Sequence, residues 1–412
     1  MKPKFMNKLD AVGYIRPGMR VLVGTVSGES TLLAEAVMDA GDDCSATYTG
    51  VFVPGLNRHT YLAGKDSRVE TYFMTEALRR AGDRVDFIPL CYQEIAARLR
   101  QAPPDAALMM LAPPEEDGLC GWGVACDFMA DLWSDIPIRI AHINSALPRT
   151  KGFAGIPYDE LTVVVEQAAP ITGSGVRTSG STPDAIGRAV APFVPDGATL
   201  QTGLGKVPEA ILGALSEHRG LKVHSGLIGD AVLDLIEAGA LANGTPITAG
   251  VAIGSDALYA ACAGDAFAFQ PVSVTHNPLI IAAIPNFIAI NSAFEVDLFG
   301  QSYAEQVAGV PLSGPGGASD FARAARLSEG GLRVVALQAQ SRDGSTSRIV
   351  PAGRGSGPVS LSRFDTDVIA TEFGAADLRG KSMEERAMAL IAVAAPDHRD
   401  MLFDSWRKTS ER

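Results

Sequence analysis

Short apolar runs alternate along the chain with segments of helical periodicity. Residues 21–24, 84–90 and 105–111 are aliphatic runs with the length of buried strands. Residues 30–40 and 92–101 space their apolar positions as one face of a helix does. This alternation is typical of α/β proteins with mostly parallel sheets.

The same pattern returns in the second half of the chain. Residues 18–24 match residues 197–203, and residues 105–118 resemble residues 287–300. Each copy has a strand, a turn or glycine-containing loop and a helix in the same order, which predicts two similar halves. We expect an N-terminal domain of residues 1–188 and a C-terminal domain of residues 189–412. The alternative is that unrelated strand–turn–helix units resemble each other.

Two glycine-rich turns stand before predicted helices. One is Gly203-Leu-Gly205, and the other is Gly314-Pro-Gly316-Gly317, which leads into a helix at residues 321–327. Backbone N–H groups in such turns can approach a ligand closely and donate to an anion. In the second turn they can also stabilise the oxygen of a carbonyl under attack. An ordinary structural turn is the alternative in both cases.

Carboxylates and histidines supply the other candidate groups. Glu372 ends an apolar strand at residues 367–374, where it would orient water or substrate, or pair with an arginine. Glu295 and Asp297 share one face of a strand, and a structural role is favoured for them over an acid/base pair. His224 and His276 are candidates, although a single histidine is more often a satisfied polar residue. The histidines show no metal-ligand spacing, so we expect no metal site.

Composition restricts the class of protein. The chain has 412 residues, of which 47% are hydrophobic and 20% charged, as expected of well-packed domains. Its net charge of −12 argues against a general nucleic-acid partner. Five scattered cysteines and the absence of an apolar signal or membrane segment favour a reducing, cytoplasmic location with no membrane partner.

A series of motifs resembles the acetyl-CoA hydrolase/transferase family. They occupy residues 112–118, 148–150, 196–211, 290–301, 313–321, 347–351 and 371–382. The resemblance implies two open, mostly parallel α/β domains of CoA-transferase type, with the acyl-CoA site between them. It also implies an acyl-CoA thioester as substrate, no permanently bound cofactor and a homodimer.

The resemblance fails at the family's nucleophile. In the family a His-Thr-Glu sequence supplies a glutamate that forms an acyl anhydride and then a CoA thioester; residues 224–226 here read His-Ser-Gly. Gly226 therefore takes the position of the nucleophile. Gly317 matches the glycine whose N–H stabilises the oxyanion, and Glu372 matches a glutamate that lines the site. His276 replaces an Asn in an Asn-Asp/Asn-Pro segment and is expected to face the site.

The resemblance also implies which residues contact CoA or the acyl group. Ser225, Gly226 and Ala318 are smaller than their family counterparts, which predicts an enlarged pocket and an acyl group bulkier than acetyl. The full set of expected contacts is Gly203, Gly205, His224, Ser225, Asn277, Gly316, Ala318 and Arg348.

Three functions remain open from the sequence. The first is acyl-CoA hydrolysis, with water in the vacated space activated by Glu372 or His276. The second is CoA transfer to a carboxylic acid by direct transfer or through a relocated carboxylate. The third is a lyase or hydratase acting on a CoA substrate, or a relative that binds acyl-CoA without turnover.

Overall fold

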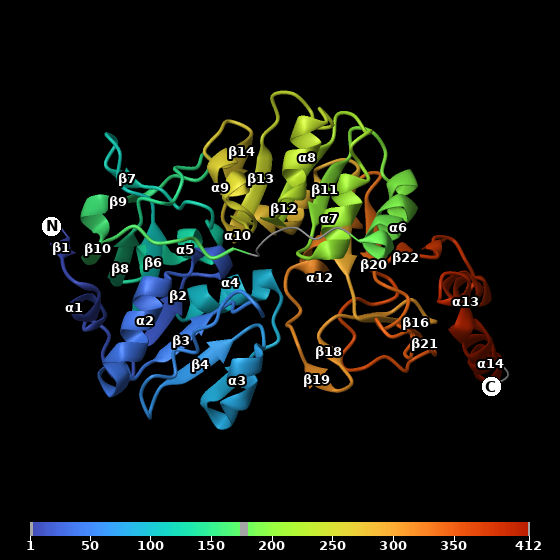
Figure 1. The fold of residues 1–412 in the computed structure, drawn as a ribbon, viewed down its shortest axis with the longest axis horizontal. Helices are drawn as coiled ribbons and strands as arrows, with labels where there is room; N and C mark the ends of the chain where they lie inside the picture. The colour runs from blue at the N-terminus through green and yellow to red at the C-terminus, as the bar shows by residue number, and fades with distance from the viewer. Residues whose placement is uncertain (1–2, 174–179, 411–412) are drawn as a thin grey trace. The chain divides into compact units, whose positions relative to one another are not determined.

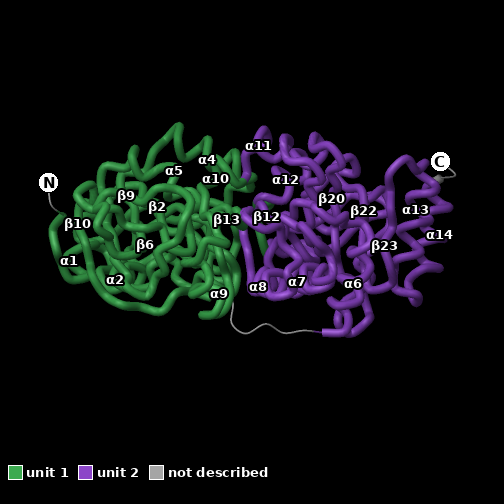
Figure 2. The backbone as a smooth tube through the Cα atoms, turned by 90° about the horizontal axis from the view of Figure 1, so that it is seen from above, with its two compact units in different colours: residues 1–176, 246–275, 312–316 green, residues 177–245, 276–311, 317–412 purple. Residues whose placement is uncertain are grey.

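The computed structural model describes residues 3–173 and 180–410. The chain forms two compact units, of which unit 1 contains residues 1–176, 246–275 and 312–316, and unit 2 contains residues 177–245, 276–311 and 317–412 (Figure 2). Neither unit is one continuous stretch, and two segments of the predicted C-terminal domain belong to unit 1. The predicted domain boundary after residue 188 falls inside helix α6 (Ser181–Val190). The division into domains of residues 1–188 and 189–412 stays a prediction.

Unit 1 is built on a sheet in which every neighbouring pair of strands is parallel. All six residues of its strand β6 are buried, as expected of a parallel sheet covered on both faces. In sheet order the strands are β1 (Lys4–Phe5), β10 (Val163–Glu166), β8 (Ile138–Ile143), β6 (Ala106–Leu111), β2 (Arg20–Val23), β3 (Thr47–Gly50), β4 (Arg68–Thr71) and β5 (Val85–Phe87).

The helices of unit 1 follow the sequence predictions closely. The helices predicted at residues 30–40 and 92–101 are confirmed as α2 (Thr31–Ala40) and α4 (Tyr92–Gln101). Ser30 begins α2 by accepting a hydrogen bond from the Leu33 N–H, which satisfies a donor of the first helical turn. The other elements are α1 (Lys8–Val12), α3 (Glu76–Arg80), β7 (Leu119–Cys120), α5 (Asp127–Leu132), β9 (Ile156–Pro157), β13 (Ile247–Ala252), α9 (Asp256–Ala261), β14 (Phe267–Phe269) and α10 (Val272–Thr275).

Unit 2 contains a second run of parallel strands. The strand predicted at residues 367–374 is shorter than expected, because the chain turns back after Thr371 and forms an antiparallel hairpin. In order, the strands are β12 (Lys222–Ile228), β11 (Thr199–Thr202), β15 (Phe287–Ser292), β20 (Leu332–Ala336), β22 (Val368–Thr371) and β23 (Gly374–Asp377).

Helices and small sheets complete unit 2. The helix predicted at residues 321–327 begins earlier, at Ala318, directly after the glycine turn. The helices are α6, α7 (Lys206–Gly213), α8 (Ala231–Glu237), α11 (Pro278–Ala282), α12 (Ala318–Ala325), α13 (Met383–Ala392) and α14 (Arg399–Ser410) (Figure 1). The small sheets are β17 (Ser302–Tyr303), β16 (Glu295–Asp297) and β21 (Ile349–Val350), and the pair β18 (Gln306–Val307) and β19 (Val310–Pro311).

The internal repeat is confirmed by strand order and register. The order β3-β2-β6-β8-β10 in unit 1 corresponds to β12-β11-β15-β20-β22 in unit 2. Val21 pairs with Ala106 in the first, and Thr199 pairs with Phe287 in the second. The repeat alignment matches Val21 with Leu200 and Ala106 with Ile288, and Leu200 pairs with Ile288 directly after the Thr199–Phe287 pair. Both copies therefore share one register. The predicted α/β class with two similar, mostly parallel sheets is therefore confirmed.

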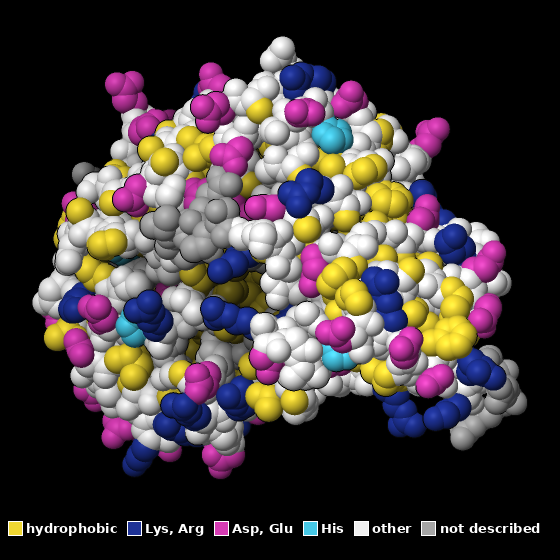
Figure 3. Space-filling model, turned by 45° about the vertical axis from the view of Figure 1, so that its right-hand side comes forward, with side chains coloured by type: hydrophobic (Ala, Val, Ile, Leu, Met, Phe, Trp, Pro, Cys, Tyr) yellow, Lys and Arg dark blue, Asp and Glu magenta, His cyan; other side chains and the backbone are white. Residues whose placement is uncertain are grey.

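Acidic and basic side chains are interspersed on the face drawn in Figure 3, with apolar side chains between them. Within the described part of the chain, no helix is both long enough and apolar enough to cross a bilayer.

Candidate active site

Strand β12 carries residues 224–226, which the resemblance aligns with the family's His-Thr-Glu sequence. This segment is extended, and the strand continues through Ile228 before α8 begins at Ala231. His224 and Ser225 are buried, and Gly226 is half-buried. Gly226 therefore lies within a strand, so the backbone fixes the direction in which a side chain at this position would point.

The imidazole of His276 lies between Gly226 and Gly317. A methyl group added to Gly226 would lie 2.7 Å from His276 Nε2, and one added to Gly317 would lie 2.5 Å from the same atom. Such approaches are closer than Cβ atoms make in proteins, so both positions require glycine while the ring is in place. The structure thus brings together three of the predicted catalytic residues.

Two phenylalanines join this group and were missed by sequence reasoning. The His276 ring centroid lies 4.6 Å from that of Phe321, which stacks on Phe287 at 6.3 Å. Phe287 in turn meets His224 edge-on at 6.1 Å. In the sequence, Phe321 follows Gly317 by one helical turn, and Phe287 begins the strand beside β11. Neither position alone predicts that the phenylalanine contacts a histidine.

Burial keeps the His276 imidazole neutral. The side chain is 3% exposed. Removal from water, and secondarily the nearby His224, lowers the pKa of His276 to about 3. At neutral pH the ring therefore retains an unprotonated nitrogen, although one of low basicity.

The predicted enlarged pocket is not found at Gly226. The space into which a longer residue 226 would project is filled by the His276 ring. The ring takes the space in which a water molecule was expected. Ala318, the first residue of α12, is half-buried.

Other predicted contacts use their polar groups in the fold. Ser225 Oγ lies 2.7 Å from the Leu227 carbonyl oxygen and 3.0 Å from that of Thr202. Asn277 caps α11, because its Oδ1 accepts a hydrogen bond of 3.0 Å from the Leu279 N–H. Ser225 and Asn277 therefore both have structural roles that do not depend on a ligand.

Glu372 is placed apart from the His276 cluster. Its Oε2 accepts a hydrogen bond of 2.8 Å from the Ala339 N–H. Glu372 lies in the turn after β22, and β22 is separated from β12 by β11, β15 and β20, which corresponds to roughly 19 Å at the usual strand spacing. Glu372 and His276 therefore do not act together on one proton by direct contact.

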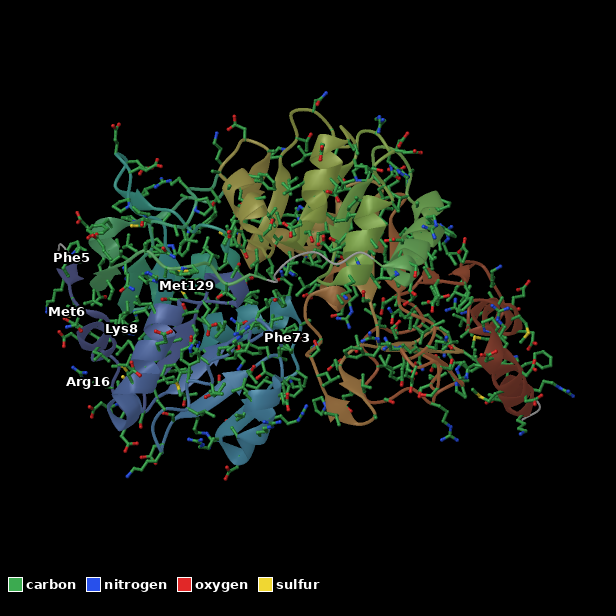
Figure 4. The ribbon with its side chains drawn as sticks, in the orientation of Figure 1. Phe5, Met6, Lys8, Arg16, Phe73 and Met129 are labelled. Atoms are coloured by element: carbon green, nitrogen blue, oxygen red, sulfur yellow. The ribbon has the colours of Figure 1, made fainter. Side chains whose placement is uncertain are left out.

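The first two glycines of the second turn, Gly314 and Gly316, belong to unit 1. A Cβ on Gly316, whose φ is 59°, would lie 3.0 Å from Phe73 Cζ, and Gly314 packs against the Tyr72 carbonyl group. Phe73 is labelled in Figure 4. Close packing and positive φ explain these glycines structurally, whereas Gly317 faces His276 in unit 2.

The first glycine loop and Arg348 lie elsewhere in unit 2. Gly205 adopts a φ of 119° as the cap of α7, and Gly203 lies half-buried before it. Arg348 is half-buried, with its backbone bonded to Ala339 and Val296. Their contacts with CoA stay predictions.

The strand carboxylates are structural, as favoured from the sequence. Glu295 accepts hydrogen bonds from the backbone and hydroxyl of Ser356 at 2.7 and 3.2 Å. The fully buried Asp297 accepts hydrogen bonds from Phe299, Gln301, Tyr303 and Gly353. These hydrogen bonds give both carboxylates a place in the fold that needs no ligand.

Cysteines and metal ligands add no further chemistry at this site. All five cysteines are buried free thiols. Across residues 3–173 and 180–410, no group of three His, Cys, Asp or Glu side chains is arranged to hold a metal ion.

Comparison with known proteins identifies the family. The chain is 31% identical to a 4-hydroxybutyrate coenzyme A transferase from Clostridium kluyveri, over 99% of this chain and 98% of the relative. The chain belongs to the acetyl-CoA hydrolase/transferase family. The sequence model of the acetyl-CoA hydrolase/transferase C-terminal domain matches residues 254–406.

Two further relatives show the range of this family. The crystal structure of RipA from Yersinia pestis has a TM-score of 0.89 and 28% sequence identity, and the match covers 99% of this chain and 98% of RipA. An acetyl-CoA hydrolase from Kluyveromyces lactis is 30% identical over 66% of this chain and 55% of the hydrolase. The members of the acetyl-CoA hydrolase/transferase family thus include proteins named for both transfer and hydrolysis.

Proposed function

We propose that this member of the acetyl-CoA hydrolase/transferase family hydrolyses an acyl-CoA thioester, with His276 taking the place of the missing carboxylate. One observation carries the proposal: the imidazole occupies the space into which a side chain at position 226 would project. A glycine has no group that can form an acyl anhydride, so a covalent carboxylate route is not open at this position.

The proposed reaction uses a water molecule and the neutral imidazole. Water attacks the acyl carbonyl carbon while His276 Nε2 takes one of its protons. The C–S bond of the resulting tetrahedral intermediate breaks, and the CoA thiolate receives the proton from the imidazolium. The products are a carboxylic acid and free CoA thiol.

The low pKa of His276 bears on the timing of proton transfer. An imidazole with a pKa of about 3 is a weak base in the empty site. A tetrahedral oxyanion next to the ring would raise that pKa, because a nearby negative charge favours the imidazolium. The transfer of the proton from water to His276 is therefore favoured most as the tetrahedral oxyanion forms. The Gly317 N–H, at the start of α12, is the proposed oxyanion donor.

The burial of His276 adds a requirement to the proposal. Since the side chain is 3% exposed, a thioester reaches it only when the ring cluster opens. The rings that must separate from His276 include Phe321, whose centroid lies 4.6 Å away.

CoA transfer to a carboxylic acid is the second candidate. It is favoured by the 31% identity with a 4-hydroxybutyrate coenzyme A transferase. A transferase without Glu at position 226 needs a carboxylate from elsewhere or direct attack by the acceptor acid. Glu372 is the carboxylate that the family resemblance offers. A CoA lyase or hydratase, or a binding protein, is the remaining alternative.

Thiol release in the absence of an acceptor acid separates these functions. The purified protein is incubated with acyl-CoA esters of increasing chain length, with and without a carboxylic acid. Hydrolysis predicts release of free CoA without the acid and a loss of roughly 100-fold or more in His276→Asn. His218→Asn is the matched control, because His218 Nε2 bonds the Val194 carbonyl oxygen outside the cluster. Turnover only with an acceptor acid would instead establish transfer, and binding without turnover would establish the third alternative.

A further inference from the structure

Unit 1 contains a second turn of the kind that carries Gly317. Residues 121–128 read Gly-Trp-Gly-Val-Ala-Cys-Asp-Phe, and residues 314–321 read Gly-Pro-Gly-Gly-Ala-Ser-Asp-Phe. Gly123 and Gly316 occupy the same place in the two turns and have φ values of 62° and 59°. The internal repeat therefore extends to this turn, and Asp127 is the counterpart of Asp320.

Asp127 lies where the strand order of unit 1 reverses. From β2 the sheet continues through β3 on one side and through β6 on the other. Functional groups in open α/β sheets gather outside the carboxyl ends of the strands at such a point. Thr25 follows β2 closely, and Thr25 Oγ1 lies 2.5 Å from Asp127 Oδ2. This bond links the loop after β2 to the turn that precedes α5.

The surroundings of the Asp127 carboxyl are mainly apolar. The residue is 3% exposed. It lines a cavity of about 10 Å³, which has room for no more than one water molecule. Thioether and aromatic side chains form much of the wall, among them Met109, Met110, Trp122 and Met129, the last of which is labelled in Figure 4.

Both segments joined by this bond have strained backbone. Val26 has a φ of 50° and Asp127 a φ of 31°, a region that non-glycine residues and β-branched ones above all avoid. Asn57 Nδ2 donates to the Val26 carbonyl oxygen at 3.1 Å, and Ser27 Oγ donates to the Ala252 carbonyl oxygen at 2.8 Å. Such strain persists only where surrounding contacts hold it and often marks a switch region.

The charge state of Asp127 is sensitive to pH. The pKa of Asp127 is raised to about 7, mainly by burial and to a smaller extent by the Asp131 carboxylate, although the Thr25 hydroxyl and the Phe128 N–H lower it. Asp131 itself pairs with Arg100 at 3.4 Å.

Two other titratable groups belong to the segments that this bond joins. The adjacent Cys126 thiol has a pKa raised well above its usual value by burial, so it stays neutral. Glu29, on the loop after β2, is bonded to Asn57 and Tyr61 at 2.8 Å each. Its pKa is raised by burial. The Asp127 carboxyl therefore titrates under the influence of Asp131 and has no role in the proposed chemistry of His276.

We propose that Asp127 is a proton-operated latch that fastens residues 24–29 to the turn of residues 121–127 when protonated and loosens them on ionisation. Thr25 Oγ1 donates to the Asp127 carboxyl in both charge states. The neutral carboxyl fits the apolar cavity, whereas ionisation leaves a buried charge beside the Asp131 carboxylate, and the cost of burial exceeds the stabilisation by the Thr25 and Phe128 donors. The latch controls the loop after β2 and goes beyond the function proposed for unit 2.

The sign of the pH effect follows from linkage. The unfolded carboxyl has a pKa of 3.8, and the folded one a pKa of about 7. The closed loop therefore holds a proton that the open loop releases, and opening becomes about tenfold more favourable for each pH unit between pH 5 and pH 6.5. The effect levels off above pH 7, where both states are ionised.

Hydrogen–deuterium exchange of residues 24–30 tests the latch. After correction for the intrinsic exchange rate, the parent protein should lose about tenfold in protection per pH unit from pH 5 to pH 6.5. Asp127→Asn should remove this dependence, because the amide is an uncharged isostere of the protonated acid. Residues 383–392, in α13, serve as an internal control. An equal pH dependence in the parent and Asp127→Asn would overturn the proposal.

A second variant keeps the test valid if Asp127→Asn does not fold. Thr25→Val retains the carboxyl but removes a donor that lowers its pKa. The pH at which the loss of protection levels off should therefore rise. A plateau at the parent's pH would also overturn the proposal.

Discussion

Substitution of Gly226 by alanine tests whether the His276 ring fills the nucleophile position. The new methyl group would lie 2.7 Å from His276 Nε2 and still closer to Cε1. The backbone at Gly226 lies outside the left-handed region, so alanine brings no backbone strain of its own. The predicted loss of stability therefore comes from the contact with the ring.

The expected magnitude combines two opposing effects. Overpacking of a well-filled core typically costs about 1–3 kcal/mol. Replacement of glycine by alanine inside a strand stabilises by about 0.5–1 kcal/mol, since glycine loses more conformational entropy on folding. Gly226→Ala should thus destabilise the parent by roughly 0.5–2 kcal/mol. In the His276→Ala background the same change should be neutral or stabilising.

A double-mutant cycle by urea unfolding measures this coupling. The four proteins are the parent, Gly226→Ala, His276→Ala and the double variant, and the expected coupling energy is about 1–3 kcal/mol. Gly213→Ala is a control, because a methyl group there meets no atom within 4 Å. An equal effect of Gly226→Ala in both backgrounds would show that the ring does not occupy this space.

Four other outcomes are expected. The pKa of His276 is about 3 in the folded protein and about 6.5 in the unfolded chain, so its contribution to stability is present above pH 6.5 and is lost as the pH falls. In urea melts the free energy of unfolding should fall by about 2 kcal/mol between pH 6.5 and pH 5. His276→Asn should remove this pH dependence. Glu372→Gln should leave thiol release without an acceptor acid unchanged, because Glu372 bonds the Ala339 N–H apart from the His276 cluster, and a loss of turnover would place it in the mechanism. Asp297→Asn should destabilise unit 2 by about 1–3 kcal/mol in the same melts, because a buried amide cannot accept all of its donors. Gly226→Glu alone should show little CoA transfer, since the glutamate meets the ring, whereas added His276→Asn should raise transfer measured with an acceptor acid.

The sequence predicted most of the fold because the decisive signals are local. Helix α4 matches its prediction at both ends, and the repeat predicted two similar halves, whose strand pairs β2–β6 and β11–β15 share one register. The hairpin of β22 and β23 was missed, because Gly374 marks a turn only once the partner strand is known. The discontinuous units were also missed, since contacts of residues 246–275 are set by tertiary packing.

The candidate site was predicted in part. Motif positions correctly brought Gly226, His276 and Gly317 together. They did not show that the ring fills the space left by the absent glutamate, because the direction of a side chain depends on its rotamer and neighbours. For the same reason Phe321 was overlooked, although its helix was predicted.

Intact-mass spectrometry after incubation with acyl-CoA tests most directly whether His276 has replaced a carboxylate nucleophile. The parent protein should release CoA thiol without forming any protein-bound CoA thioester. The double variant Gly226→Glu with His276→Asn should accumulate such an adduct at residue 226. A CoA thioester on any carboxylate of the parent protein would contradict the account.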